Sequence, residues 1–149
     1  MTMNFKTISS GEAVAIESIP HLSFGDFSTQ ARSIVSGGGK VVQFFAFHVD
    51  GSVRLMAVLR TAELVIASCD LPESYPALTA QCEPFHMFER EIAEQYGLRP
   101  EGHPWLKMVR FHPNYLGRED VFGNDYNEDL PGNYDYYAVA GEEVHEVAV

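Results

Sequence analysis

Basic residues are scarce in this 149-residue chain, and none occurs after Arg118. Ten Lys and Arg stand against 21 Asp and Glu, which gives a formal net charge of −11. Nine of the acids lie in the last 31 residues (149 − 118), so this segment carries −9 of the −11. Nucleic-acid phosphates and anionic lipid headgroups attract positive charge, which makes both of them poor partners. A basic protein surface is a better match for the acidic segment.

Cysteine and long apolar runs are also rare. Only Cys69 and Cys82 occur, with no CxxC or other metal-binding spacing. Such a pair is typical of a reducing compartment, with both thiols buried as small apolar groups. No apolar run approaches the ~20 residues of a membrane span, and the N-terminus shows no apolar core of signal-peptide length. We expect a protein that reaches a membrane complex only through protein contacts.

Catalytic motifs are missing as well. There is no GxSxG elbow and no HExxH helix. Gly37–Lys40 lacks the first glycine, the Ser/Thr and the following helix of a phosphate loop. Residues 125–136 imitate half of a calcium loop but have Leu130 at the glycine position. His86 and Glu89 stand one turn apart, yet a metal site needs three or four converging ligands. We therefore expect no catalytic residues, metal or cofactor in this chain.

The apolar residues that are present predict one α+β domain with a mostly antiparallel sheet and helices packed on one face. Three runs are rich in β-branched and aromatic residues and predict strands at 41–49, 52–60 and 63–69. The first run is apolar on both faces, as a central strand would be. Asp50-Gly51 predicts a tight hairpin between the first two strands. The expected core comprises Phe44, Ala46, Leu55, Ala57, Leu64, Ile66, Phe88 and Ile92.

Helices are expected around this sheet. The first begins near Asp26 or Ser28 and ends at the glycines 37–39, and the second runs from Pro84 to about Tyr96. We expect a loop at 71–76, a short strand at 78–82, mostly irregular structure from Pro100, and strand-like segments at 136–139 and 144–149. The domain boundaries that follow are 1–116 for the α+β domain and 117–149 for an irregular acidic tail or linker toward a partner.

The second helix and its downstream loop carry the most specific pattern. Phe85, Phe88, Ile92 and Tyr96 form its apolar stripe. Arg90 and Glu94 can pair one turn apart, which contributes only a few tenths of a kcal/mol when exposed. Gly102 and Pro104 shape the following loop, which presents His103 and Trp105 rigidly, unless Trp105 plugs the core instead.

These residues resemble a known family. The series Glu89-Arg90-Glu91-Ile92, Tyr96-Gly97-Leu98 and Glu101-Gly102-His103-Pro104 is similar to the signature of the thirty-kilodalton subunit of respiratory complex I, the respiratory NADH dehydrogenase. The same domain occurs in formate-hydrogenlyase-type [NiFe] hydrogenases. This chain has Glu94 where the family usually has Asp, and it lacks the family's Pro-Leu-Arg-Lys-Asp segment. Its end, residues 136–147, is similar to the junction with the large subunit in the hydrogenase branch.

The resemblance implies the α+β fold of the thirty-kilodalton subunits and a non-catalytic, structural role in a membrane-associated redox complex on the cytoplasmic side. The partner would be the large subunit, either hydrogenase-like or of the forty-nine-kilodalton type found in complex I. The [NiFe] or Fe–S centres would lie only in partner subunits. The residues carried over to the partner interface are Glu89, Arg90, Glu91, Gly97, Gly102, His103 and Pro104.

Two other functions stay open at this point. The chain could be a small enzyme that uses the helix carboxylates with His86 or His103 for acid–base work. It could also be a ligand-binding regulatory domain, which would need a well-formed apolar pocket.

Overall fold

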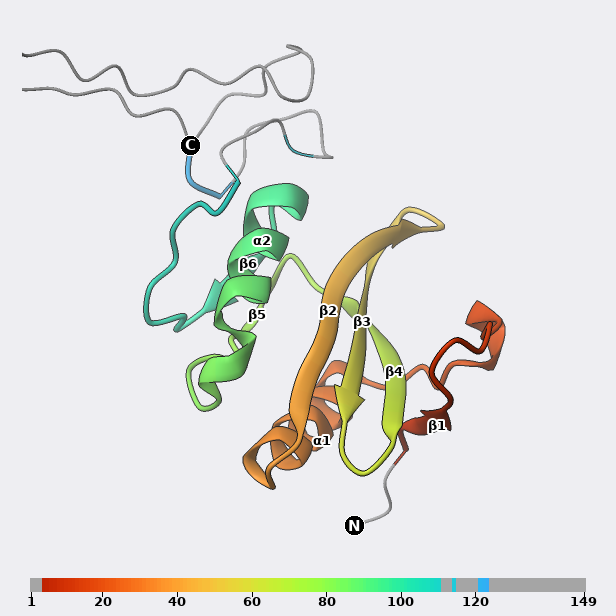
Figure 1. Cartoon of the computed structure of the whole chain (residues 1–149). Helices are drawn as coiled ribbons and strands as arrows, with labels where there is room; N and C mark the ends of the chain where they lie inside the picture. The colour runs from red at the N-terminus through yellow and green to blue at the C-terminus, as the bar shows by residue number, and fades with distance from the viewer. Residues whose placement is uncertain (1–3, 111–113, 115–120, 124–149) are drawn as a thin grey trace, which may run out of the picture.

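The computed structural model describes residues 4–110, 114 and 121–123 and shows an α+β fold (Figure 1). Its four-stranded antiparallel sheet has the order β1-β4-β3-β2. The strands of this sheet are β1 (Lys6–Ile8), β2 (Lys40–Val49), β3 (Ser52–Arg60) and β4 (Leu64–Leu71). The helical elements are α1 (Phe24–Ser36), α2 (His86–Tyr96) and the 3-10 turns η1 (Ile16–Ser18) and η2 (Glu83–Phe85). The predicted α+β class with a mostly antiparallel sheet is confirmed.

The β2–β3 hairpin forms where the sequence predicts it. Asp50 and Gly51 both have positive φ angles, 48° and 82°, and Val49 pairs with Ser52. Two consecutive positive φ angles are the requirement of a type I′ turn, whose twist matches that of the flanking strands. This turn fixes the register of the hairpin, in which Phe44 faces Ala57 and Ala46 faces Leu55.

Strand β2 lies at an edge of the sheet, so its predicted central position is wrong. Among the described strands it pairs only with β3, whereas β3 and β4 each have two neighbours. Apolar residues on both faces of a strand predict a central position in the sheet only when other elements pack on both faces. Here Phe44 and Ala46 are buried on one face, while Phe45 on the other face is 41% exposed.

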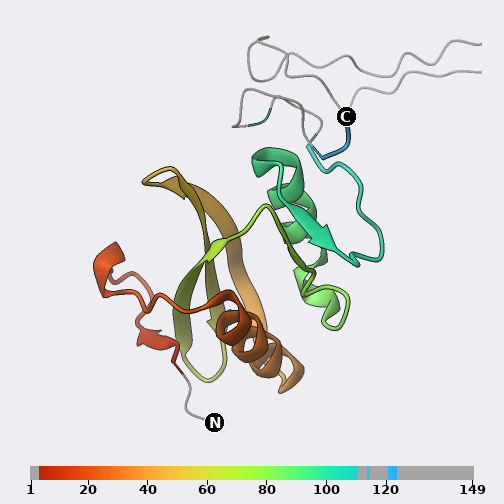
Figure 2. The same ribbon diagram turned by 180° about the vertical axis from the view of Figure 1, so that it is seen from behind.

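Both helices pack on the same face of the sheet and enclose the main core. One core cluster joins the sheet residues Phe44 and Leu55 to the helices. It contains Phe27 of α1, Phe85 just before α2 and Ile92 in α2. Seen from behind, α1 lies across the sheet while α2 stands beside β2 (Figure 2). Six of the expected core residues are buried, and Leu64 and Phe88 are half-buried.

Helix α1 begins earlier than predicted. Its N-cap is Ser23, whose Oγ accepts a hydrogen bond from the backbone N–H of Asp26 at 3.1 Å. Asp26 lies in the first turn, where its carboxylate accepts from the Ser23 hydroxyl and complements the helix dipole. Ser28 is buried inside the helix and its hydroxyl donates to the carbonyl of Gly25.

Two predictions around α2 are also wrong. Residues 78–82 form no strand but a turn closed by backbone bonds such as Cys82 N–H to the Leu78 carbonyl, 2.9 Å. The expected loop at 71–76 contains β5 (Ser74–Pro76), which pairs in parallel with β6 (Arg99–Glu101) within the region expected to be irregular. Parallel pairing joins segments that are distant along the chain, so it leaves no local signal in the sequence.

Several predictions fall outside the described residues. They are the acidic tail or linker at 117–149, apart from 121–123, and the strand-like segments at 136–139 and 144–149. Within the described part of the chain, no helix is long and apolar enough to cross a bilayer. Cys69 and Cys82 are both buried and unbridged, as the sequence predicts.

Candidate interaction site around helix α2

Helix α2 is placed by its two ends and its apolar side. Pro84 lies in the 3-10 turn η2 that precedes the helix, and Gly97 ends the helix in a left-handed conformation with φ 63°. The N–H of Gly97 bonds to the carbonyl of Ala93 at 3.1 Å, which satisfies one of the last carbonyls. Phe85 and Ile92 pack into the core, so the orientation of the charged residues between them is fixed.

Glu89 points inward and holds the 78–82 turn. Its side chain is fully buried, and one carboxylate oxygen accepts the N–H of Leu78 at 2.8 Å. The other oxygen accepts the N–H and the hydroxyl of Thr79, at 2.9 and 2.6 Å. Burial raises the pKa of Glu89, and these three hydrogen bonds to the carboxylate partly offset the rise. Glu89 therefore accepts the backbone N–H groups of Leu78 and Thr79, which have no partners in a strand.

Arg90 points to the other side of the helix, where it holds the segment 105–110. Its Nε donates to the carbonyl of Lys107 and its Nη2 to the carbonyl of Met108, both at 2.7 Å. The guanidinium also lies 4.9 Å from the centre of the Trp105 ring, in a cation–π arrangement. Arg90 is only 7% exposed, so it is an internal group of this region.

Glu94 and Glu91 complete the attachment of this segment. The buried carboxylate of Glu94 accepts the N–H groups of Val109 at 2.6 Å and of Arg110 at 3.0 Å. Glu91 forms an ion pair with Arg110 at the surface, 2.6 Å between Oε1 and Nε. Four charged side chains of one helix thus bind the backbone or side chains of two flanking segments.

His103 joins the loop to the start of α2 through both ring nitrogens. Its Nδ1 accepts the N–H of Trp105 at 3.1 Å, which leaves the proton on Nε2, 3.2 Å from the carbonyl of His86. Burial lowers the pKa of His103, and the hydrogen bond with the His86 carbonyl partly offsets this fall. The nearby His86 ring and Arg90 guanidinium lower the pKa further. The neutral form is thereby favoured. Gly102 supplies the turn before it with a φ of 75°.

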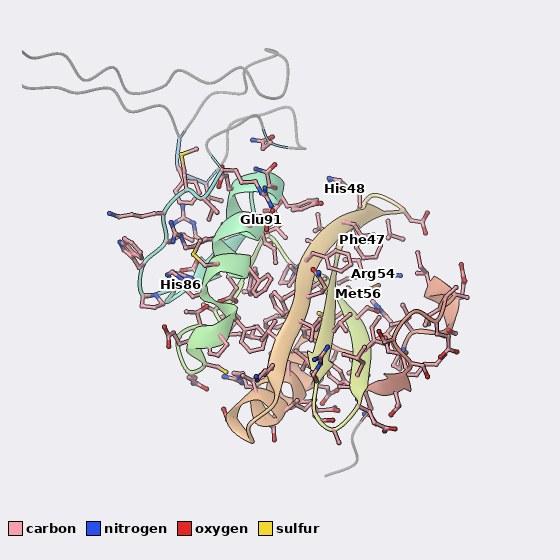
Figure 3. All side chains as sticks on the ribbon, in the orientation of Figure 1. Phe47, His48, Arg54, Met56, His86 and Glu91 are labelled. Carbon is pink, nitrogen blue, oxygen red and sulfur yellow. The ribbon has the colours of Figure 1, made fainter. Side chains whose placement is uncertain are left out.

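An exposed aromatic surface lies on top of this framework. Trp105 is 54% exposed and Met87 49%, and both contact Arg90, Met87 through its sulfur at 3.3 Å. The Trp105 ring stacks on His86 with centroids 5.8 Å apart, and the Lys107 ammonium lies 5.1 Å from the same ring. We call His86, Met87, Trp105 and Lys107 the aromatic patch. Figure 3 shows His86 on the side of α2 that faces away from β2.

The structure brings some of the predicted interface residues together. Arg90 and His103 both contact Trp105 of the aromatic patch, and Gly102 and the exposed Pro104 shape its loop. Glu89 faces the opposite side, and Gly97 marks the far end of the helix. The interface role of these residues stays a prediction.

Met87 and Lys107 were not predicted as surface residues from the sequence, which also left open whether Trp105 plugs the core. The exposure of Trp105 excludes that alternative. Met87 precedes the charged run on the face opposite Ile92, which is the only signal that could have pointed to it.

A serine–histidine–aspartate arrangement occurs on the far side of the sheet. His21 Nδ1 lies 3.3 Å from Ser68 Oγ, and His21 Nε2 lies 3.4 Å from Asp70. However, Ser68 is buried and its hydroxyl donates to the carbonyl of Pro20. A nucleophile must reach a substrate, so this arrangement fastens the N-terminal segment to β4 and is not a catalytic triad. Among the described residues, no group of three or more His, Cys, Asp or Glu side chains is placed to hold a metal ion.

Comparison of the chain with models of known families and with curated proteins found no match. The resemblance to the thirty-kilodalton subunit of complex I therefore rests on the residues of α2 and its downstream loop.

Proposed function

We propose that this chain is a non-catalytic assembly subunit or domain of a membrane-associated redox complex, either NADH dehydrogenase-like or a group 4 [NiFe] hydrogenase. It would dock on the hydrogenase-like large subunit of that complex. The proposal rests on the Glu-Arg-Glu helix and Gly-His-Pro loop of the sequence, and on the surface that these two elements build together.

The observation that carries the proposal is the exposure of Trp105 and Met87 on a rigid support. Trp105 lies between His86, Arg90 and Lys107, so its ring has few alternative positions. Tryptophan and arginine are among the residues most enriched at the energetic centres of protein interfaces. An aromatic side chain that is already ordered loses little conformational entropy on binding, which favours affinity.

The charged residues of α2 support docking indirectly. Arg90 and Glu94 hold residues 107–110, and His103 holds Trp105, so together they fix the shape of the surface. Glu91 and Arg110 form the polar rim beside it. Glu89 stabilises the opposite side of the helix and has no exposed surface of its own.

The redox chemistry would belong to the partners in this proposal. [NiFe] or Fe–S centres are expected in other subunits, and this chain would hold its large subunit in position at the cytoplasmic side of the membrane. The neutral His103 and the fully bonded Glu89 support this assignment, because both are engaged in holding backbone.

The test is to co-express the tagged chain with a large subunit, either of group 4 [NiFe] hydrogenase or of complex I, and to follow both by size-exclusion chromatography. We expect the two proteins to co-elute, and we expect the purified chain alone to show no turnover with NADH, formate or hydrogen. Turnover by the isolated chain, or separate elution from both kinds of large subunit, would overturn the proposal.

A further inference from the structure

The sheet has a second exposed apolar surface, far from the aromatic patch. Phe45 and Phe47 lie on the outer face of β2, the face turned away from α1 and α2, with ring centroids 5.9 Å apart. Phe45 is 41% exposed, and Val42, at the bulge of the same strand, is exposed too. Figure 3 shows Phe47, Arg54 and Met56 together on the side of β2 opposite to α2.

The N-terminal segment covers only the other half of this outer face. Ile19 packs on Met56 and Ile66, and the backbone of residues 20–22 bonds to Ser68 of β4. These contacts shield the edge and outer face of β4. Phe47 is half-buried against the same cluster as Ile19 and Met56. Within the described residues, no comparable segment covers Phe45, so the part of the outer face around Phe45 is open.

The charge of the outer face is opposite to that of the whole chain. Residues paired across antiparallel strands share a face, which places on the outer face the bases Lys6, Lys40, Arg54 and Arg60. The single acid of the four strands, Asp70, lies on the same face and is bonded to Arg54. Over the strand residues alone, the formal sum on this face is 4 − 1 = +3 in a chain of −11.

We propose that the outer face at β2 is a docking surface for the acidic segment of this same chain, residues 124–149. This segment pairs seven acids and no base with the aromatic residues Tyr126, Tyr134, Tyr136 and Tyr137. Tyrosine rings suit contact with Phe45, and the carboxylates suit pairing with Lys40 and Arg60 at one end of the β2–β3 pair and with Arg54 nearer the other end. The proposal is independent of the proposed function, because it uses no residue of the aromatic patch.

The length of chain allows this contact. The stretch from Gly123, which the structure places, to Tyr134 spans up to about 36 Å when extended. A folded unit of ~110 residues has a radius of gyration of about 13 Å, so every part of the outer face is within reach. A tethered segment also has an effective concentration in the millimolar range, which suffices for a weak, salt-dependent contact.

The experiment uses the full chain with a nitroxide spin label on Asn127→Cys and ¹⁵N throughout. The native thiols are poor labelling sites, since both are buried and burial raises the pKa of Cys69 to about 12. The unmutated chain, treated identically, checks that they take up no label. Amide signals are compared with the label active and reduced. The comparison is repeated on a mixture of spin-labelled ¹⁴N chain with ¹⁵N chain that carries no spin label.

We expect the amides of Phe45 and Phe47 to lose most of their intensity, and β1 and α1 to lose little. Lys40→Glu with Arg60→Glu should restore the signals, whereas Arg99→Glu, an exposed base outside this face, should not. Raising the salt from about 0.1 M to about 1 M shortens the screening length from ~10 to ~3 Å and should restore them without any mutation. Unchanged β2 signals, or a loss that survives high salt, would refute the proposal. Intensity loss at β2 in the mixture, where only contacts between chains can cause it, would assign the surface to a second copy instead.

Discussion

The two sides of α2 bury charge for different purposes. On the inner side Glu89 is fully buried, and all of its hydrogen bonds go to a turn of the same core. On the outer side Arg90 and Glu94 bond to the backbone of residues 107–110, which lie at the surface beside Trp105. A charged run on an amphipathic helix is normally solvated. In this helix one side supports the fold and the other fixes the shape of the exposed surface around Trp105.

The largest effect is expected on the inner side. Glu89→Ala leaves the buried N–H groups of Leu78 and Thr79 without acceptors, and we expect a loss of about 3 kcal/mol in the free energy of unfolding. Glu91→Ala on the same helix is the matched control, because its exposed ion pair should contribute under ~1 kcal/mol. Urea denaturation measures both, and equal losses would show that Glu89 has no special role.

The difference between the two sides could be predicted only in part. The boundaries of the β2–β3 hairpin and the end of α2 at Gly97 follow from local turn chemistry. The pairing of β5 with β6 and the edge position of β2 depend on contacts between distant segments. A single sequence does not carry that information in its local pattern.

The candidate site shows the same limit. The sequence predicts a helix with charges at 89, 90, 91 and 94, and an ordered loop at His103. It does not reveal that the Arg90 partners are backbone carbonyls of Lys107 and Met108, because any residue supplies a carbonyl. The exposure of Trp105 likewise depends on how that segment crosses α2.

A smaller loss is expected on the outer side. Arg90→Glu removes two hydrogen bonds to carbonyls and adds a negative charge beside Glu91 and Glu94, so we expect about 2 kcal/mol. Arg90→Lys keeps the charge but cannot span both carbonyls and should fall between the wild type and Arg90→Glu. Thermal unfolding with calorimetry measures the series. A loss of only a few tenths of a kcal/mol in Arg90→Glu would mean that Arg90 is a plain surface residue.

The two sides should also respond oppositely to pH. The folded-state pKa of Glu89 is raised above 4.5, so its contribution to stability is greatest below 4.5 and falls as the pH rises through the raised value. The folded-state pKa of His103 is lowered below 6.5, so its contribution is present above 6.5 and is lost as the pH falls through the lowered value. Melting midpoints against pH for the wild type, Glu89→Gln and His103→Asn test both signs. A difference between wild type and His103→Asn that stays constant on acidification would contradict the neutral His103.

Removing a buried polar group that has no hydrogen-bond partner should not destabilise the fold, in contrast to removing Glu89. Gln95 is 2% exposed, and its amide has no hydrogen-bond partner within the described part of the chain. Gln95→Met has a similar volume and removes this unsatisfied group, so we expect no loss of stability or a gain of up to ~1 kcal/mol. Urea denaturation beside Glu89→Ala is the comparison. Destabilisation by more than ~1 kcal/mol would indicate that Gln95 has a partner that this account omits.

The smallest effect on folding and the largest on assembly should come from Trp105. Ile16→Ala is the matched control, because Ile16 is 51% exposed and lies on η1, outside the aromatic patch. The decisive measurement is the Kd of each variant for the large subunit by calorimetry, alongside its melting midpoint. We predict that Trp105→Ala weakens binding at least ~30-fold, which is about 2 kcal/mol, while its midpoint stays close to that of the wild type. Ile16→Ala should bind like the wild type. Equal affinity for Trp105→Ala and Ile16→Ala would contradict the account, because the rigidly held tryptophan would then take no part in docking.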